Sequence, residues 1–371
     1  MTDLLNGNFI IDGIPMGLSP ARMLRLCSEE APLEPDGDPV SVADEQPDYS
    51  PDNYPFKDSS IGAYSKALSV PLKRSLPLPF AGLFTAARVA QALIDAIWMS
   101  GHFRLGDLSL RAEWRWNDKA IGNAAAFYQS VESACNYIDA LGLKIEKYSV
   151  TSGQPWVSFK ATTVAEEDAS DEDTSFFREL PYRTANPRIS RRRKVPATVL
   201  PSAGDWLLYI PFDPCDYRLG GSALAQALGA RPATAPDVSD ADYFIDCYEV
   251  VRELVEDGVV RSGATVGEGG LLSCLKGMAS AGTGADICLQ DICKAYGEAS
   301  QTRILFSEVP GVVIQIADTD YDYVDAELIL QDVVYFPLGH PVARRASVKL
   351  TQAVEIPQIL ESLLNTIEGE D

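Results

Sequence analysis

Histidine is scarce in this chain, which has only two, His102 and His340, among 371 residues. So few histidines leave little room for a His-based catalytic triad or for a multi-histidine metal centre. The seven cysteines are scattered and form no Cys-X-X-Cys pair. We therefore expect the cysteines to be small buried side chains in a reducing compartment.

Basic residues are also few. The chain has 31 Lys and Arg residues but 53 Asp and Glu residues, which gives a net charge of −22. This balance argues against nucleic-acid binding, which needs basic surface to displace counterions, and against adhesion to anionic membranes. No apolar run approaches the ~20 residues needed to span a bilayer. The start MTDLLNGNF lacks the basic residues and the apolar core of a signal peptide. The sequence therefore predicts a cytoplasmic protein with a solubilising acidic surface.

What is present is an ordinary globular composition, with 46% hydrophobic and 23% charged residues and enough length for two domains. Asn123 is the expected N-cap of one helix, and Ser239 or Asp240 is that of a later one. Hydrophobic spacing predicts a further helix over 80–98. An apolar helix is expected after the glycine pair 269–270, and another helix over 320–330, between the last two strands. The predicted strands are 108–114, 143–149, 156–163, 204–212, 286–289, 303–306, 312–317 and 333–336.

A compositional break divides the chain into parts. Residues 164–203 combine an acidic run, EEDASDED, with a basic run, RISRRRK, and we interpret them as a charged linker. Residues 1–59 are rich in Pro, Asp and Ser and are expected to form an extended N-terminal arm. The alternating helices and strands predict an α/β (α+β) chain with an N-terminal domain at 60–163 and a C-terminal domain at 204–371.

Two glycine-rich turns are candidates for anion binding. RLGGS opens a predicted helix, where free backbone N–H groups suit a phosphate, although an ordinary tight turn from strand to helix is the alternative. TVGEGG offers a second such turn. TVGEGG is not a dinucleotide fingerprint, because it lacks the preceding strand with the right helix and an acidic residue about 20 positions on, and it is not a P-loop, because no GK[ST] is present. The candidate nucleotide- or phosphate-binding residues are Arg218, Gly220, Gly221, Ser222, Gly269 and Gly270.

Three carboxylates are candidate ligands for Mg²⁺. Glu308 sits at a strand edge in LFSEVPG, Glu268 lies in the second glycine-rich turn, and Asp95 lies on the helix predicted over 80–98. Converging carboxylate oxygens are the ligands that Mg²⁺ prefers. The sequence does not determine whether the three side chains converge on one point. The alternative is therefore that Glu308 only caps a turn.

Seven segments, in one order from residue 15 to residue 316, resemble the aminoimidazole ribonucleotide synthetase superfamily. Within it the chain is most similar to the second, C-terminal synthetase half of the phosphoribosylformylglycinamidine synthases. Each segment alone is a weak signal, and the shared order makes the resemblance specific. The segments are PMGLSPARMLR (15–25), ARVAQALIDAI (87–97), LGDLSLRAEW (105–114), AAFYQSVESACNYIDALGLKI (125–145), RLGGSALAQ (218–226), GEGGLL (267–272) and LFSEVPGVVIQI (305–316).

The resemblance implies a fold and a reaction in purine biosynthesis. The fold is an N-terminal domain whose sheet dimerises into a barrel, followed by a C-terminal α/β domain. In the reaction, ATP activates an amide oxygen as an iminophosphate and ammonia displaces the phosphate. Mg²⁺ bound by carboxylates offsets the developing charge. The implied cofactors are Mg²⁺ and ATP or ADP.

The chain departs from the family pattern where that pattern carries the chemistry. The magnesium helix of the family has Glu and Asn where this chain has Gln91 and Asp95. The family's DxSDGGL loop has Asp at both positions where this chain has Thr265 and Glu268, and its acidic pair after LF is reduced to Glu308. The family's GKDS loop reads YSVTSGQPW here, and these residues contain neither a glutaminase domain nor a first synthetase half.

Three hypotheses follow from this pattern. The leading one is a non-catalytic homologue, a pseudoenzyme that needs no cofactor and serves as a scaffold or subunit. It would form a homodimer or a hetero-oligomer with another synthetase-like chain, because an isolated half is expected to leave an apolar sheet face uncovered. The second is an active ATP-dependent ligase that converts an amide to an amidine, with Mg²⁺ on Asp95, Glu268 and Glu308. The third is a nucleotide-binding regulator that does not hydrolyse ATP.

Overall fold

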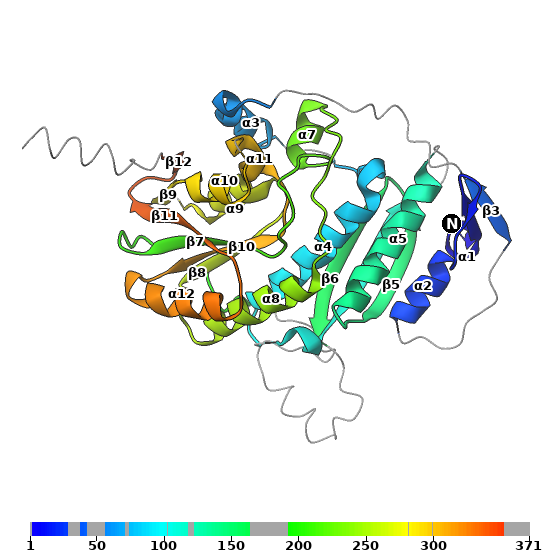
Figure 1. Cartoon of the computed structure of the whole chain (residues 1–371), viewed down its shortest axis with the longest axis horizontal. Coiled ribbons are helices and arrows are strands. Elements are labelled where there is room, and N and C mark those ends of the chain that lie inside the picture. The colour runs from blue at the N-terminus through cyan, green and yellow to red at the C-terminus, as the bar shows by residue number, and fades with distance from the viewer. Residues whose placement is uncertain are drawn as a thin grey trace, which may run out of the picture.

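The computed structural model describes residues 2–28, 38–42, 56–70, 74–101, 103–117, 122–163, 192–280, 282–298 and 300–351. The predicted linker at 164–203 therefore lies outside the described residues up to position 191, and so does everything after Thr351. The described elements form two mixed α/β parts that lie side by side, with helix α4 (Ala81–Ile97) between them (Figure 1). This confirms the predicted fold class.

The N-terminal part is built on a three-stranded sheet with the strand order β5-β4-β6. Strand β4 (Leu108–Trp116) pairs in parallel with β5 (Ile145–Ser152) and antiparallel with β6 (Trp156–Thr163). Helices α4 and α5 (Asn123–Ala140) pack against each other, and buried side chains of both join those of the sheet in one core. Along β4, Ala112, Trp114 and Trp116 are buried in that core.

The other face of this sheet is polar. Arg111, Glu113 and Arg115 alternate with the buried residues of β4, and Glu113 and Arg115 are exposed. Their neighbours across the ladder include Lys147 on β5 and Lys160 on β6. The strict alternation of a strand buried on one face explains this pattern. The expected uncovered apolar sheet face is therefore not found among the described strands.

The first 28 residues fold onto the N-terminal part. Helix α2 (Pro20–Cys27) packs on α5, and Phe9 and Leu24 are buried in the shared core. Ser19 caps α2 by accepting a hydrogen bond from the backbone N–H of Arg22. This segment differs from the extended arm that its composition suggested. The segment also contains α1 (Thr2–Asn6) and the strands β1 (Asn8–Ile11) and β2 (Ile14–Pro15), and β1 pairs in parallel with the later strand β3 (Pro39–Val42).

The C-terminal part is a six-stranded sheet with the order β12-β9-β11-β7-β10-β8. The central strands β7 (Trp206–Pro211) and β10 (Gly311–Ile316) are antiparallel and almost fully buried. The other strands are β8 (Ser262–Val266), β9 (Thr283–Ile287), β11 (Phe336–Ala343) and β12 (Val348–Leu350). Helices cover both faces of this sheet (Figure 1), so alternate residues of β7 and β10 enter two separate cores.

Helix α8 (Ala241–Glu256) and helix α12 (Tyr321–Leu330) contribute to the core that β7 and β10 share with α4. The opposite core is closed by α9 (Gly270–Met278), α11 (Gln301–Phe306) and their neighbours. Asp240 is the N-cap of α8, one of the two residues predicted for that role. The remaining helices are α3 (Ile61–Ala67), α7 (Ala223–Leu228) and α10 (Gln290–Ala295).

The helical stretch Leu78–Ile97, which contains α4, is long and apolar enough to cross a membrane by length and composition alone, which corrects the expectation that no apolar stretch approaches that length. The stretch Leu78–Ile97 has a mean hydropathy of 1.4 in its most apolar window, and 61% of that window is buried inside the protein. The helix packs against α5 and β6 on one side and against α8, β8 and β10 on the other. Its apolar character is that of a core helix shared by both parts.

Three local predictions were wrong. The strand predicted at 333–336 begins only at Phe336, the first residue of β11. The strand predicted at 303–306 forms the last four residues of helix α11. The Ser300 side chain accepts from the N–H of Arg303, and Asp58 accepts from the N–H of Thr302, so capping of the helix start outweighs the strand propensity of the apolar residues. Asn123 is the first residue of α5 and not its N-cap, a position that Gly122 takes with a φ of 79°.

Candidate functional site

Arg74 is the residue around which several predicted site residues gather. Its side chain is only 3% exposed, and its Nη2 atom lies 3.1 Å from Glu308 Oε2 while Nη1 lies 3.3 Å from Glu268 Oε1. Nη2 also donates to the carbonyl oxygen of Gly221 at 3.2 Å. A guanidinium group thus stands between two of the three carboxylates that the sequence offered as metal ligands.

The carboxylate of Glu308 is also held by two backbone amides. Its Oε1 atom accepts hydrogen bonds from the N–H of Ala223 at 2.8 Å and from the N–H of Gly269 at 2.9 Å. Ala223 begins α7 and Gly269 directly precedes α9, and free amides at helix starts attract anions. The two glycine-rich turns therefore share one anion, which is the side chain of Glu308.

The glycines of these turns have packing reasons to be glycine. A Cβ at Gly220 would lie 2.4 Å from the carbonyl oxygen of Thr234. Gly270 has a φ of 73°, and a Cβ there would lie 2.7 Å from the carbonyl oxygen of Leu305. Close approach of backbone and a left-handed φ both favour glycine strongly. Packing is therefore a sufficient reason for glycine at these two positions.

Arg218 and Ser222, also predicted to bind phosphate, are engaged in local contacts. Arg218 Nη2 lies 2.6 Å from Asp216 Oδ2, in a pair that is partly exposed. Ser222 is the N-cap of α7, and its hydroxyl oxygen accepts a hydrogen bond from the N–H of Ala225 at 3.2 Å. Arg218 is therefore paired with a neighbouring carboxylate, while Ser222 stabilises the start of a helix.

Asp95, the third predicted metal ligand, has a different partner. Its Oδ1 atom accepts from the hydroxyl of Thr265 at 2.5 Å, and that hydroxyl accepts from the indole N–H of Trp98 at 2.9 Å. Although the residue is exposed to solvent, desolvation by the surrounding protein raises the pKa of Asp95, and the hydrogen bond from Thr265 and the charge of Arg193 only partly oppose this. The structure brings Glu268 and Glu308 to one guanidinium and gives Asp95 a hydroxyl partner instead.

Arg88, on the same helix as Asp95, adds a second guanidinium to the cluster. Its Cζ atom lies 4.7 Å from the ring centroid of Phe84 and 4.9 Å from that of Trp156. Its Nη2 atom is 3.5 Å from Glu268 Oε2. Burial lowers the pKa of Arg88, and the nearby glutamates oppose this shift. With two guanidinium groups and two carboxylates, the cluster has a net charge of zero.

This donor set does not fit a magnesium–nucleotide as it stands. The described part of the chain has no group of three or more His, Cys, Asp or Glu side chains placed to hold a metal ion. The cavity beside the cluster, lined by Phe84, Gln91 and Gly221 among others, has a volume of about 20 Å³, which suits a water molecule and not a nucleotide. A cation would first have to displace Arg74, so the metal and nucleotide sites stay predictions.

Sequence reasoning missed Arg74. The signal was available, because Arg74 belongs to SVPLKRSLPLPF, an apolar segment interrupted by only two basic residues. An arginine buried in such surroundings requires a carboxylate partner. Its partner Glu308 lies 234 positions further along the chain. The need for a partner was thus readable, but its identity was not.

Comparison with protein families and curated proteins gives a consistent result. Residues 202–333 match the family described as AIR synthase related protein, C-terminal domain. The chain is 26% identical to phosphoribosylformylglycinamidine synthase of Homo sapiens over 262 residues, which cover 70% of this chain and 18% of that protein. It is 28% identical to the Drosophila melanogaster protein over 264 residues, which cover 68% and 18%. The chain therefore spans less than a fifth of the length of these relatives.

Solved structures share the fold. Thermotoga maritima PurL complexed with FGAR superimposes with a TM-score of 0.53 at 13% identity, covering 75% of this chain and 42% of that one. PurLQS from Thermotoga maritima gives a TM-score of 0.50 at 13% identity, covering 75% and 41%. At this identity the likeness concerns the fold alone, and it agrees with the mixed α/β architecture.

Proposed function

Because the chain is a phosphoribosylformylglycinamidine synthase-like homologue of the AIR synthase superfamily, we propose that it is a non-catalytic member that works as a scaffold or subunit. The observation that carries the proposal is the buried Arg74 guanidinium between Glu268 and Glu308. Of the side chains offered as ligands for a cation or a phosphate, Glu268, Glu308 and Arg218 are each paired with an opposite charge of the same chain.

The physical argument rests on the cost of opening this cluster. Arg74 is 3% exposed and Glu308 is 10% exposed, so their ion pair is largely withdrawn from water. Separating a buried pair leaves an uncompensated charge, at a cost of about 3–5 kcal/mol. Glu268 is 50% exposed and contributes less. A divalent cation would have to recover this cost before it gained any net binding energy, so tight Mg²⁺ binding is disfavoured.

The scaffold role would be exercised in an assembly. We propose a homodimer or a hetero-oligomer with a second synthetase-like chain. The outer face of the three-stranded sheet carries Arg111, Glu113 and Arg115, so a partner on this face would have to supply complementary charges and not an apolar surface. We also propose the division at 60–163, 164–203 and 204–371, and a cytoplasmic location.

The test is an activity and binding assay on the purified chain. Incubation with ATP, Mg²⁺, formylglycinamide ribonucleotide and ammonia should release no phosphate above a blank, and calorimetry with Mg²⁺ and ADP should show no binding. A phosphoribosylformylglycinamidine synthase assayed in parallel is the positive control. Turnover would refute the proposal in favour of an active ligase, and Asp95→Ala should then abolish it. Heat at micromolar ADP without turnover would refute it in favour of a nucleotide-binding regulator.

A further inference from the structure

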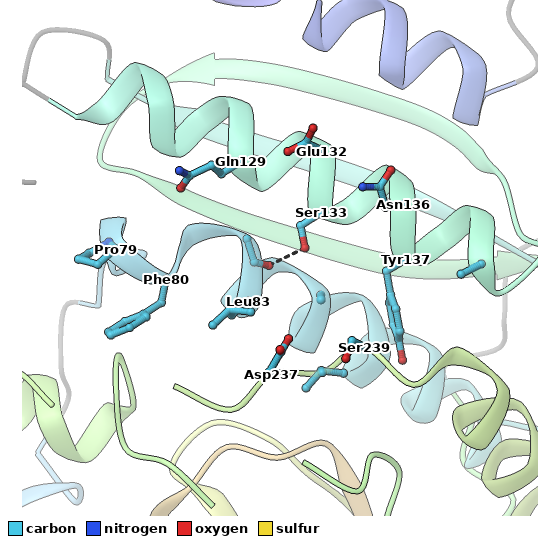
Figure 2. Close-up of a pocket in the computed structure, with 14 residues that line it drawn as sticks. Pro79, Phe80, Leu83, Gln129, Glu132, Ser133, Asn136, Tyr137, Asp237 and Ser239 are labelled. Atoms are coloured by element: carbon cyan, nitrogen blue, oxygen red, sulfur yellow. Dashed lines mark hydrogen bonds between the residues drawn. The ribbon is translucent and has the colours of Figure 1, made fainter. Parts of the chain in front are cut away.

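A second cavity lies next to the Arg74 cluster but is lined by a largely different set of residues. Its volume is about 460 Å³, within the range of small-molecule sites. Figure 2 shows the first turns of α4 in the middle, α5 on one side and the segment that leads into α8 on the other. The cavity is thus a depression between the two parts, with α4 as its floor.

The floor of this depression is apolar and closely packed. Phe80, Leu83 and Ala86 of the α4 region line it together with Val238 from the segment before α8. The hydroxyl of Ser133 on α5 donates to the carbonyl oxygen of Gly82 at 2.9 Å, drawn as the dashed line in Figure 2, and this bond fixes α5 against α4. A ligand that covered the floor would bury hydrocarbon surface, which is favourable.

The two walls carry one carboxylate each. Glu132 stands on α5 and Asp237 on the segment across α4 (Figure 2). The lining includes no Lys, Arg or His. Neither Glu132 nor Asp237 takes part in an ion pair among the described residues, and Glu132 Oε1 accepts a hydrogen bond from the hydroxyl of Tyr128 at 3.4 Å. The cavity therefore presents negative charge on both sides of a hydrocarbon floor.

We propose that this cavity binds an aliphatic diamine. Such a ligand has two ammonium groups joined by a chain of methylene groups. One ammonium would pair with Glu132 and the other with Asp237, while the methylene chain would lie on Leu83 and Ala86. The ring of Phe80 offers an additional face for an ammonium group. Binding should be modest, because both carboxylates are accessible to water and exposed ion pairs are weak.

The experiment uses the full chain and calorimetric titration with 1,5-diaminopentane at 150 mM salt. Pentylamine and 1,5-pentanediol serve as probes with one charge and no charge. We expect saturable binding of one diamine per chain, about fivefold weaker binding of the monoamine, and none of the diol, since each exposed pair contributes up to about a fivefold factor. No saturable binding of the diamine, or equal binding of the diol, would overturn the proposal.

Variants separate this site from general attraction to an acidic protein. Glu132→Gln and Asp237→Asn should each weaken diamine binding about fivefold. Asp332→Asn, an exposed residue just beyond α12, makes the same change in net charge outside the cavity and should leave binding unchanged. A thermal unfolding curve shows that each variant folds. If Asp332→Asn weakened binding as much as the cavity variants, the binding would be non-specific and the proposal wrong.

Discussion

Replacing Arg74 tests the central electrostatic feature of this protein. In Arg74→Met the hydrocarbon part of the side chain is kept and the guanidinium is removed, which leaves Glu308 buried without its cation. Loss of one partner from a buried pair costs about 3–5 kcal/mol. Glu308 keeps its hydrogen bonds from the backbone N–H groups of Ala223 and Gly269, and Glu268 is half exposed to water. Each of these facts reduces the loss of unfolding free energy. We therefore expect the low end, about 3 kcal/mol.

The assay is equilibrium unfolding by urea at pH 7, with the free energy of unfolding extrapolated to water. Arg111→Met is the matched control, because Arg111 pairs with Glu146 on the outer sheet face with both side chains roughly one-third exposed. Removal of that exposed pair should cost less than about 1 kcal/mol. The reasoning is refuted if Arg74→Met is no more destabilising than Arg111→Met.

A second substitution at the same position addresses the cation site. If the guanidinium stands where a divalent cation would otherwise sit, its removal with the smaller Arg74→Ala should make room for one. Addition of 10 mM MgCl₂ should then stabilise Arg74→Ala more than the wild-type chain, by an amount set by ligand concentration over Kd. An equal effect of MgCl₂ on both proteins contradicts this interpretation.

Three further predictions concern single contacts, and all can be measured by urea or thermal unfolding. Tyr137 has a buried hydroxyl with no hydrogen-bond partner among the described residues, so Tyr137→Phe should raise stability by up to about 1–3 kcal/mol, and a loss would contradict the assignment. Burial acts to raise the pKa of Asp58, but hydrogen bonds from Thr302 and its neighbours prevail and lower it. The stability from Asp58 is thus present above the pKa of the unfolded chain and lost as pH falls through the folded value, so Asp58→Asn should cost about 1 kcal/mol at pH 7 and nothing near pH 2. Gly270→Ala should destabilise by more than 1 kcal/mol through its left-handed φ and its contact with backbone, whereas Gly277→Ala in the same helix, with open space around it, should stabilise by about 0.5–1 kcal/mol.

The sequence was most informative where a single element determines its own structure. The helix predicted over 80–98 is α4 at Ala81–Ile97, and the helix predicted over 320–330 is α12 at Tyr321–Leu330. The first has a long, continuous hydrophobic pattern, whereas the second is ten residues long and buries only Val324 and Leu328. The prediction for 303–306 failed because the apolar residues Ile304, Leu305 and Phe306 suit a strand as well as a helix. The capping that favours the helix comes partly from Asp58, far away in the chain.

The candidate site was only partly predictable for a related reason. Local motifs identified the two glycine-rich turns and the acidic residues Glu268 and Glu308. They could not indicate that Arg74 enters between these carboxylates, because the contact joins positions 234 residues apart. They also could not separate a glycine kept for packing, such as Gly220 against Thr234, from one kept to approach a ligand. Both distinctions depend on tertiary contacts.

The position of Glu308 has a mechanical consequence. One carboxylate ties together the segment before α4, the start of α7 and the start of α9, three pieces that belong to both parts of the molecule. Enzymes that close around substrates need a hinge that yields on the microsecond to millisecond timescale. Here the ion pair and the two backbone hydrogen bonds of Glu308 join the two parts where they meet. We therefore expect the two parts to move together in solution as one rigid body.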